Sequence, residues 1–223
     1  MEIKKIILFL TLLGIVFTYP LNYKIKYFGI HVADCSISRS NIKFDNYDAK
    51  KIIFKVKTKP FFRYLFPVDN NYELIINANY ETLFFSKSTF QPNVENYIET
   101  EIREEKVYYK NSDLEIPIDS YNIFSLLYSI MSKEIPVGNF ILEKEGMTYM
   151  ASVKSLGSNI YDFSINDSEY NSNKSIIQNT DIFTWGIFLK KSKRRLIIDS
   201  ETGLINKCIF KKGIITIKAE LDN

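Results

Sequence analysis

The residue types that most often carry catalysis are sparse in this chain. His31 is the single histidine in the sequence, so neither a Ser-His-Asp site nor a multi-histidine metal site can be assembled from it. The two cysteines, Cys35 and Cys208, form no Cys-x-x-Cys pair, which argues against thiol redox catalysis. We therefore expect no metal site, and we assign His31 a structural role.

The sequence also lacks the motifs that bind nucleotides or activate a serine or zinc. It has no glycine-rich phosphate loop, no Gly-x-Ser-x-Gly elbow and no His-Glu-x-x-His helix. Two acidic pairs, Glu99 with Glu101 and Glu143 with Glu145, would each share a strand face as a glycosidase pair does. Such acids are more common on an outer surface, so we expect them there and predict no enzyme, no catalytic residue and no cofactor.

The strongest charge feature is a basic run that we place at the tip of a hairpin. Guanidinium and ammonium groups at such a tip could bind phosphate head groups or another anionic partner. The favoured alternative is an ordinary solvated turn. The residues of this run are Lys190, Lys191, Lys193, Arg194 and Arg195.

The N-terminal segment has the form of a signal peptide. Lys4 and Lys5 precede an apolar run from Ile6 to Phe17 that is too short to span a bilayer comfortably. We predict a signal peptide over residues 1–18 with cleavage before Tyr19; a retained anchor is the alternative. Cleavage lowers the formal net charge from +3 to +2, so attraction to nucleic acid or membrane does not follow from the overall charge. The mature chain would be exported, with no transmembrane segment and no nucleic-acid partner.

Export would place both cysteines in an oxidising compartment. A disulfide between Cys35 and Cys208 is then one interpretation, because it would close a very long loop. In the chain-entropy model such a bridge stabilises by about 4–5 kcal/mol. Two separate buried thiols are the alternative, and the sequence leaves both open.

One segment, Asp119 to Gly138, keeps a helical period. Asp119 or Ser120 can cap the first turn, and Phe124 and Tyr128 are bulky and apolar on the second side of the helix. Because apolar residues cover most of the circumference, we predict a buried helix. The residues that recur at i, i+4, i+7 and i+8 are Ile123, Leu127, Ile130 and Met131.

Most of the remaining chain alternates between apolar and polar residues with the period of a strand. We predict about a dozen strands, including Ile182 to Leu189, and a long exposed loop from Asn166 to Thr180. A change of apolar phase at Gly29 indicates a bulge or bend within one curling strand. With no linker or repeat visible, the prediction is a single, mainly β domain over residues 19–223. Its fold would be a curved antiparallel sheet or open β-barrel around one buried α-helix.

An aromatic cluster between Pro60 and Pro67 is too apolar for an ordinary loop. It could line the mouth of an apolar pocket, although a short helical turn that plugs one end of the core is the favoured alternative. With the apolar residues of the predicted helix it defines a candidate ligand cleft. The cleft residues are Phe61, Phe62, Phe66, Ile123, Leu127 and Met131.

Three segments resemble the DUF3108 family of bacterial exported proteins: Asn22–Ile30, the helix from Asp119 to Tyr128 with its exit Ile135–Gly138, and Arg194–Ile198 with Gly203–Ile205. The resemblance covers nearly the whole mature chain. It implies a periplasmic location and a mostly β fold, and it brings no established activity. By analogy, the architecture is similar to lipoprotein-carrier half-barrels, in which a curved sheet covers a helix and shelters an acyl chain.

These observations together lead to two expectations about function. The first is a non-enzymatic periplasmic binding or carrier module with an apolar cleft between sheet and helix, whose partner is a hydrophobic or lipid ligand or another envelope component. The second is a structural or scaffolding protein of the envelope with the same fold, a solid core and no small-molecule ligand. The space between sheet and helix distinguishes them.

Overall fold

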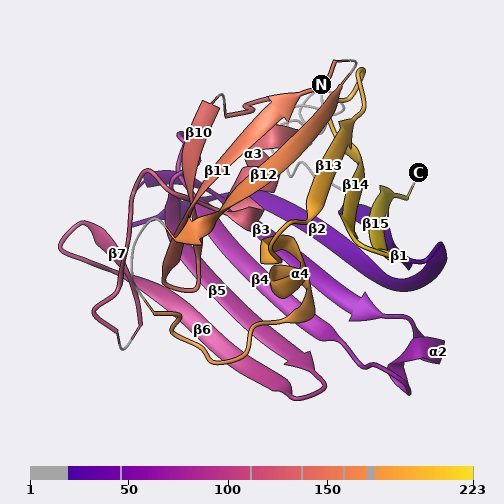
Figure 1. Ribbon diagram of the computed structural model, residues 1–223. Helices are drawn as coiled ribbons and strands as arrows, with labels where there is room; N and C mark the ends of the chain where they lie inside the picture. Colours follow the sequence, from indigo (N-terminus) through magenta and orange to yellow (C-terminus); the bar gives the residue numbers. More distant parts are fainter. Residues whose placement is uncertain are drawn as a thin grey trace, which may run out of the picture.

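The computed structural model shows one large, curved, open sheet with two helices on its concave side (Figure 1). The predicted signal peptide lies outside the described residues, and the mainly β, curved-sheet architecture is confirmed. The predicted details were too simple, because these residues contain 15 strands and three helices instead of a dozen strands and one helix. The structure describes residues 20–45, 47–110, 112–136, 138–157, 159–169 and 174–222.

The chain enters the sheet in its middle and builds antiparallel hairpins toward one edge. A short helix, α2 (Pro60–Arg63), follows the third strand. Local alternation explains most of these strands; in β4, for example, the buried side chains repeat every second residue. The strands of this half are β1 (Leu21–Tyr27), β2 (Ile30–Phe44), β3 (Tyr47–Thr58), β4 (Asp69–Ile76), β5 (Thr82–Gln91), β6 (Val94–Arg103), β7 (Lys106–Tyr109) and β8 (Glu115–Ile116).

The second half of the sheet starts at the opposite edge and returns to the middle. Its first strand pairs in parallel with the next, the later pairs are antiparallel, and the final strand pairs with β1. The strands are β9 (Tyr121–Asn122), β10 (Gly138–Lys144), β11 (Met147–Ser155), β12 (Ile160–Glu169), β13 (Lys193–Ile198), β14 (Ile205–Lys212) and β15 (Ile215–Leu221).

A tight turn separates β1 from β2, so the predicted single curling strand is wrong. Phe28 and Gly29 both have positive φ, at 48° and 86°, as the two central residues of a type I′ hairpin turn do. A register shift between Ile25 and Lys26 does occur in the pairing of the two strands. The change of apolar phase therefore marks a reversal of the chain.

Helix α3 (Ile123–Met131) is shorter than the predicted segment and starts later. Its cap is Asn122, whose side chain accepts hydrogen bonds from the backbone N–H groups of Phe124 and Ser125. The Ser125 hydroxyl in turn accepts from the Asn122 backbone N–H, which completes a capping box. The predicted caps, Asp119 and Ser120, precede β9 instead. The helix is buried, and Phe124 contacts the rings of three strand residues, Phe54, Tyr72 and Phe85.

Helix α4 (Ile182–Phe188) occupies a segment predicted to be a strand. The Asp181 carboxylate accepts hydrogen bonds from the N–H groups of Phe183 and Thr184, and this cap starts a helix in an otherwise ambiguous apolar run. The predicted loop from Asn166 to Thr180 is also shorter, because β12 continues to Glu169. Within the described ranges, no helix has the length and apolar character needed to cross a membrane.

The cap of α3 can be tested by removing each alternative capping side chain. We expect Asn122→Ala to lower the free energy of unfolding by about 1 kcal/mol, because two buried N–H groups lose their acceptor. Asp119→Ala, at the position that the sequence favoured, should change it by less than about 0.5 kcal/mol. Urea denaturation followed by circular dichroism measures both variants. Equal losses would contradict the assigned cap.

Candidate functional site

An apolar pocket with a volume of about 160 Å³ lies between helices α3 and α4 and the inner face of the sheet. Leu127 of α3, Phe183 and Ile187 of α4, and Ile217 of β15 form much of its wall. An engineered apolar cavity of about 150 Å³ is known to stay dry and to bind benzene. The pocket therefore has room for a small apolar group.

A second apolar pocket, of about 130 Å³, adjoins the first on the β1–β4 side. It extends the apolar space past Met131 at the end of α3 toward Phe54 and Tyr72. Together the two pockets form a continuous apolar lining between the sheet and both helices. The residues that line both pockets are Ile25, Leu127, Phe183, Cys208 and Ala219.

The structure brings together only half of the predicted cleft residues. Ile123 and Leu127 line the first pocket, and Leu127 and Met131 line the second. Phe61, Phe62 and Phe66 line neither pocket. They belong to α2 and the turn after it, where no helical residue is buried and Phe61 is 75% exposed. This aromatic cluster therefore neither lines the mouth of the cleft nor plugs one end of the core.

Both cysteines are free thiols in the structure. Cys35 lies on β2 and Cys208 on β14, and β1 and β15 separate them. Three strand spacings amount to about 14 Å, whereas a disulfide requires Cα atoms within about 7 Å. Of the two interpretations that the sequence left open, the structure therefore has the separate thiols and no disulfide. Burial raises the pKa of each thiol to about 12, so neither is a ready nucleophile.

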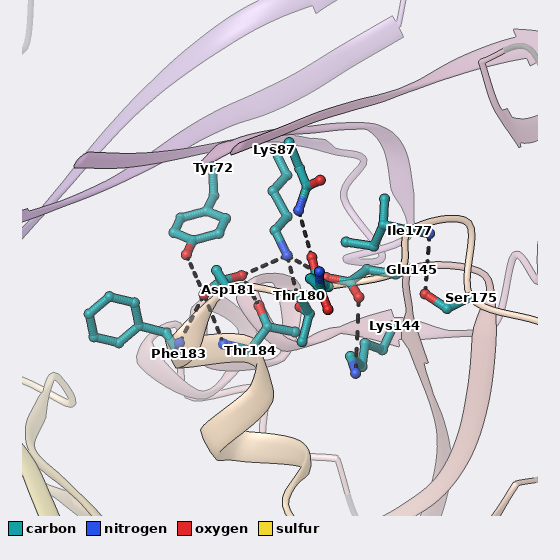
Figure 2. Close-up of polar contacts among 12 residues, drawn as sticks. Tyr72, Lys87, Lys144, Glu145, Ser175, Ile177, Thr180, Asp181, Phe183 and Thr184 are labelled. Atoms are coloured by element: carbon teal, nitrogen blue, oxygen red, sulfur yellow. Dashed lines mark hydrogen bonds and ion pairs between the residues drawn. The ribbon is translucent and has the colours of Figure 1, made fainter. Parts of the chain in front are cut away.

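A buried charge cluster lies beside the pockets and centres on Lys87 of β5 (Figure 2). The Lys87 side chain is 1% exposed. Its Nζ contacts the Glu145 carboxylate, lies 2.6 Å from Asp181 Oδ2 and donates to Thr180 Oγ1 at 3.1 Å. Two carboxylates from distant segments therefore share one ammonium group in the interior.

Asp181 joins this cluster to helix α4 and to strand β4. Its Oδ1 accepts a hydrogen bond from the Tyr72 hydroxyl at 2.8 Å, and its Oδ2 accepts one from the Thr184 hydroxyl at 2.7 Å. Burial opposes ionisation of Asp181, but the Lys87 ammonium and the hydrogen bonds from Thr184 outweigh it and hold its pKa below the usual value. The carboxylate thus holds the first turn of α4 against the sheet.

Glu143 lies close to the cluster, but its pKa is shifted in the opposite direction from that of Asp181. It accepts hydrogen bonds from the Tyr109 hydroxyl at 2.5 Å and from the Gly146 N–H at 2.7 Å. Burial nevertheless raises the pKa of Glu143 to about 7. The expected surface location of Glu143 and Glu145 is wrong, because they are 4% and 3% exposed and find their partners in the interior. Glu99 and Glu101 do pair near the surface, with Lys110 and Arg103 respectively.

The basic run follows helix α4 and leads into β13, so it does not form a hairpin tip. Lys190, Lys191 and Lys193 are exposed. Arg195 is also exposed and pairs with Asp162 at 2.7 Å. Arg194 is only 9% exposed and does not belong to the exposed patch. Its guanidinium donates to the backbone carbonyls of Ile187, Ser192 and Leu189 and thereby closes the end of α4.

Sequence reasoning missed the centre of this site, although weak signals were present. In β5 the buried positions 85, 87, 89 and 91 alternate with more exposed ones, so Lys87 occupies an inward position that normally holds an apolar residue. Asp181 stands three residues before Thr184, which is a capping pattern. Throughout the described ranges, no group of three or more His, Cys, Asp or Glu side chains is placed to hold a metal ion.

Comparison with known proteins finds a similar fold but no function. No protein-family model and no curated protein matches the chain. A crystal structure of a β-barrel-like protein of the domain of unknown function DUF1849, from Brucella abortus, aligns with a TM-score of 0.51 and 7% identity. The alignment covers 92% of this chain and 95% of that one. A DUF1089 family protein from Pseudomonas aeruginosa aligns with a TM-score of 0.41 and 11% identity, over 76% of this chain and 87% of that chain.

Removal of the central ammonium group tests the charge cluster. We expect Lys87→Met to lower the free energy of unfolding by roughly 3–5 kcal/mol, because Glu145 and Asp181 would stay buried without their counter-ion. Lys55→Met replaces an exposed lysine of β3 and should change the free energy of unfolding by about 0.5 kcal/mol or less. Chemical denaturation gives both values. A similar small change in both variants would show that the cluster does not hold the fold together.

The raised pKa of Glu143 makes stability depend on pH. A carboxyl whose folded-state pKa exceeds its unfolded value stabilises the fold while protonated, below about pH 4.5, and that stabilisation is lost as pH rises to about 7. The loss is on the order of 3 kcal/mol. We therefore expect Glu143→Gln to remove most of the decline between pH 5 and pH 8. Glu95→Gln, on an exposed strand position, serves as the control and should keep the wild-type pH profile.

Proposed function

We propose that the protein is an exported, non-enzymatic binding or carrier protein that holds an apolar ligand, such as an acyl chain, between the sheet and helices α3 and α4. The observation that carries this proposal is the lining of the larger pocket. Apart from Arg194 and Arg195, every residue around it is apolar. A site of this kind excludes water from a hydrocarbon ligand over most of its surface.

Export to the periplasm and kinship with the DUF3108 family belong to the same proposal. They rest on the lysine-led apolar segment at residues 1–18 and on the three sequence segments that resemble that family. The buried acids take a structural part in this proposal, since Glu145 and Asp181 share Lys87 and Glu143 is held by Tyr109. None of the three is then required for chemistry.

Filling the pocket tests the proposed function. Wild-type protein should bind a fluorescent fatty acid, cis-parinaric acid, and Leu127→Trp should weaken that binding at least about tenfold, because the larger side chain occupies both pockets. Ile118→Trp, at a position that is 65% exposed, should bind as the wild type does. Circular dichroism confirms that both variants fold.

Two outcomes would contradict the proposal. The first is that wild-type protein shows no probe binding and carries no lipid in native mass spectrometry of material purified from its own host. Alternatively, both tryptophan variants could bind the probe equally well. Either result would favour the envelope scaffolding protein, which has the same fold and no small-molecule ligand.

A further inference from the structure

Large apolar side chains gather at three turns at one end of the sheet. Exposed apolar patches of this kind commonly mark sites of interaction. Tyr64 is 93% exposed and Ile214 is 84% exposed, so these two side chains bury little apolar surface within the described fold. Of the 14 large hydrophobic residues that are exposed within the described ranges, eight belong to this group: Tyr27, Phe28, Ile30, Phe61, Tyr64, Leu65, Phe66 and Ile214.

The order of the strands brings the three turns together. The strands β4, β3, β2, β1, β15 and β14 are consecutive neighbours in the sheet, and their antiparallel hairpins β1–β2, β3–β4 and β14–β15 reverse at the same end. Backbone hydrogen bonds link the turns, from Lys59 N–H to the Val32 carbonyl at 2.9 Å and from Phe28 N–H to the Thr216 carbonyl at 3.3 Å. Figure 1 shows α2 and the turn between β1 and β2 at the right of the molecule. We call these three turns the turn face.

One aromatic residue of the turn face has an unfavourable backbone conformation. Phe28 has a φ of 48°, a left-handed conformation that costs a bulky residue roughly 1 kcal/mol or more. Asn or Gly would adopt it more readily. The Phe28 ring remains 54% exposed and forms a T-shaped pair with its neighbour Tyr27, with ring centroids 4.6 Å apart. More than half of this phenylalanine side chain is therefore available to a partner outside the fold.

Positive charges surround the apolar side chains. Five cationic residues at this end form no ion pair within the part of the chain that the structure describes: Arg63, Lys190, Lys191, Lys211 and Lys212. A sixth, Lys193, lies close enough to the Asp162 carboxylate to help lower its pKa. Lys193 and Lys211 are direct neighbours across β13 and β14, and Lys212 is paired with Ile215 beside the turn. The nearby acids Asp34 and Asp69 are held by Lys59 and Lys57. This end of the sheet is therefore cationic, although the net charge of the whole chain is small.

We propose that the turn face docks onto the surface of an anionic lipid bilayer. Aromatic and aliphatic side chains on turns can enter the head-group region, while lysine and arginine beside them attract anionic lipids. Both kinds of residue are present at the same end of the sheet, in the three turns and at the strand ends beside them. The proposal is independent of the ligand in the apolar pocket, because the turn-face side chains line neither pocket.

Vesicle sedimentation tests this proposal with the full mature chain. The protein should bind vesicles that contain phosphatidylglycerol much more strongly than vesicles of phosphatidylcholine alone, and added salt should weaken that binding. The double variant Lys211→Gln with Lys212→Gln should lose about fivefold in partition coefficient for each lysine removed. Its matched control is Lys43→Gln with Lys154→Gln, at the opposite end of the sheet, which should bind as the wild type does.

The apolar part of the turn face requires its own variant. Phe61→Ser, Tyr64→Ser and Leu65→Ser combined should reduce binding at both low and high salt, because these side chains act by burial in the bilayer. The control combines Tyr97→Ser, Ile118→Ser and Leu156→Ser, which are exposed elsewhere. Unchanged circular dichroism shows that each variant folds. Equal binding to both kinds of vesicle, no binding to either, or equal losses in the control variants would overturn the proposal.

Discussion

The shape of the molecule depends on one short connection between the two edges of its sheet. Fifteen strands laid flat would extend across roughly 65–70 Å, yet only residues 117–120 separate β8 at one edge from β9 at the other. Five residue steps reach at most about 18 Å. The sheet must therefore curl until its edges nearly meet. This curvature creates an interior, and α3, which follows β9 directly, is placed inside it by the same connection.

The interior is filled in two different ways. Around α3 the filling is apolar, with Phe124 among the rings of Phe54, Tyr72 and Phe85. Between the two halves of the sheet it is ionic, because Lys87 from the first half contacts Glu145 and Asp181 from the second. A buried ion cluster is weak evidence for stability, since desolvation offsets much of the attraction. Its directional contacts can instead fix how α4 and the β10–β11 hairpin sit against β5, next to the apolar pockets.

The sequence predicted those features of the fold that depend on local periodicity. Alternation along the strands and the apolar period from Ile123 to Met131 were sufficient for a mainly β fold with a buried helix. They were insufficient for α4, because a seven-residue apolar run fits a buried helix and a buried strand equally well. They were also insufficient for Lys87, which lies between Ser86 and Ser88 and looks like a solvent-facing lysine. Apart from its weak alternation signal, contacts between segments more than 50 residues apart identify it as buried.

The pairing of β1 with β15 has a consequence for how the chain reaches this fold. Tyr23 lies opposite Leu221, so a central ladder of the sheet joins residues almost 200 positions apart in sequence. Contacts between residues so far apart in the sequence form slowly. Until β15 arrives, β1 and β14 keep unpaired backbone edges that can recruit strands from other molecules. A chain with this topology is therefore most vulnerable to aggregation before its last strand is in place, and it would benefit from a chaperone that covers those edges.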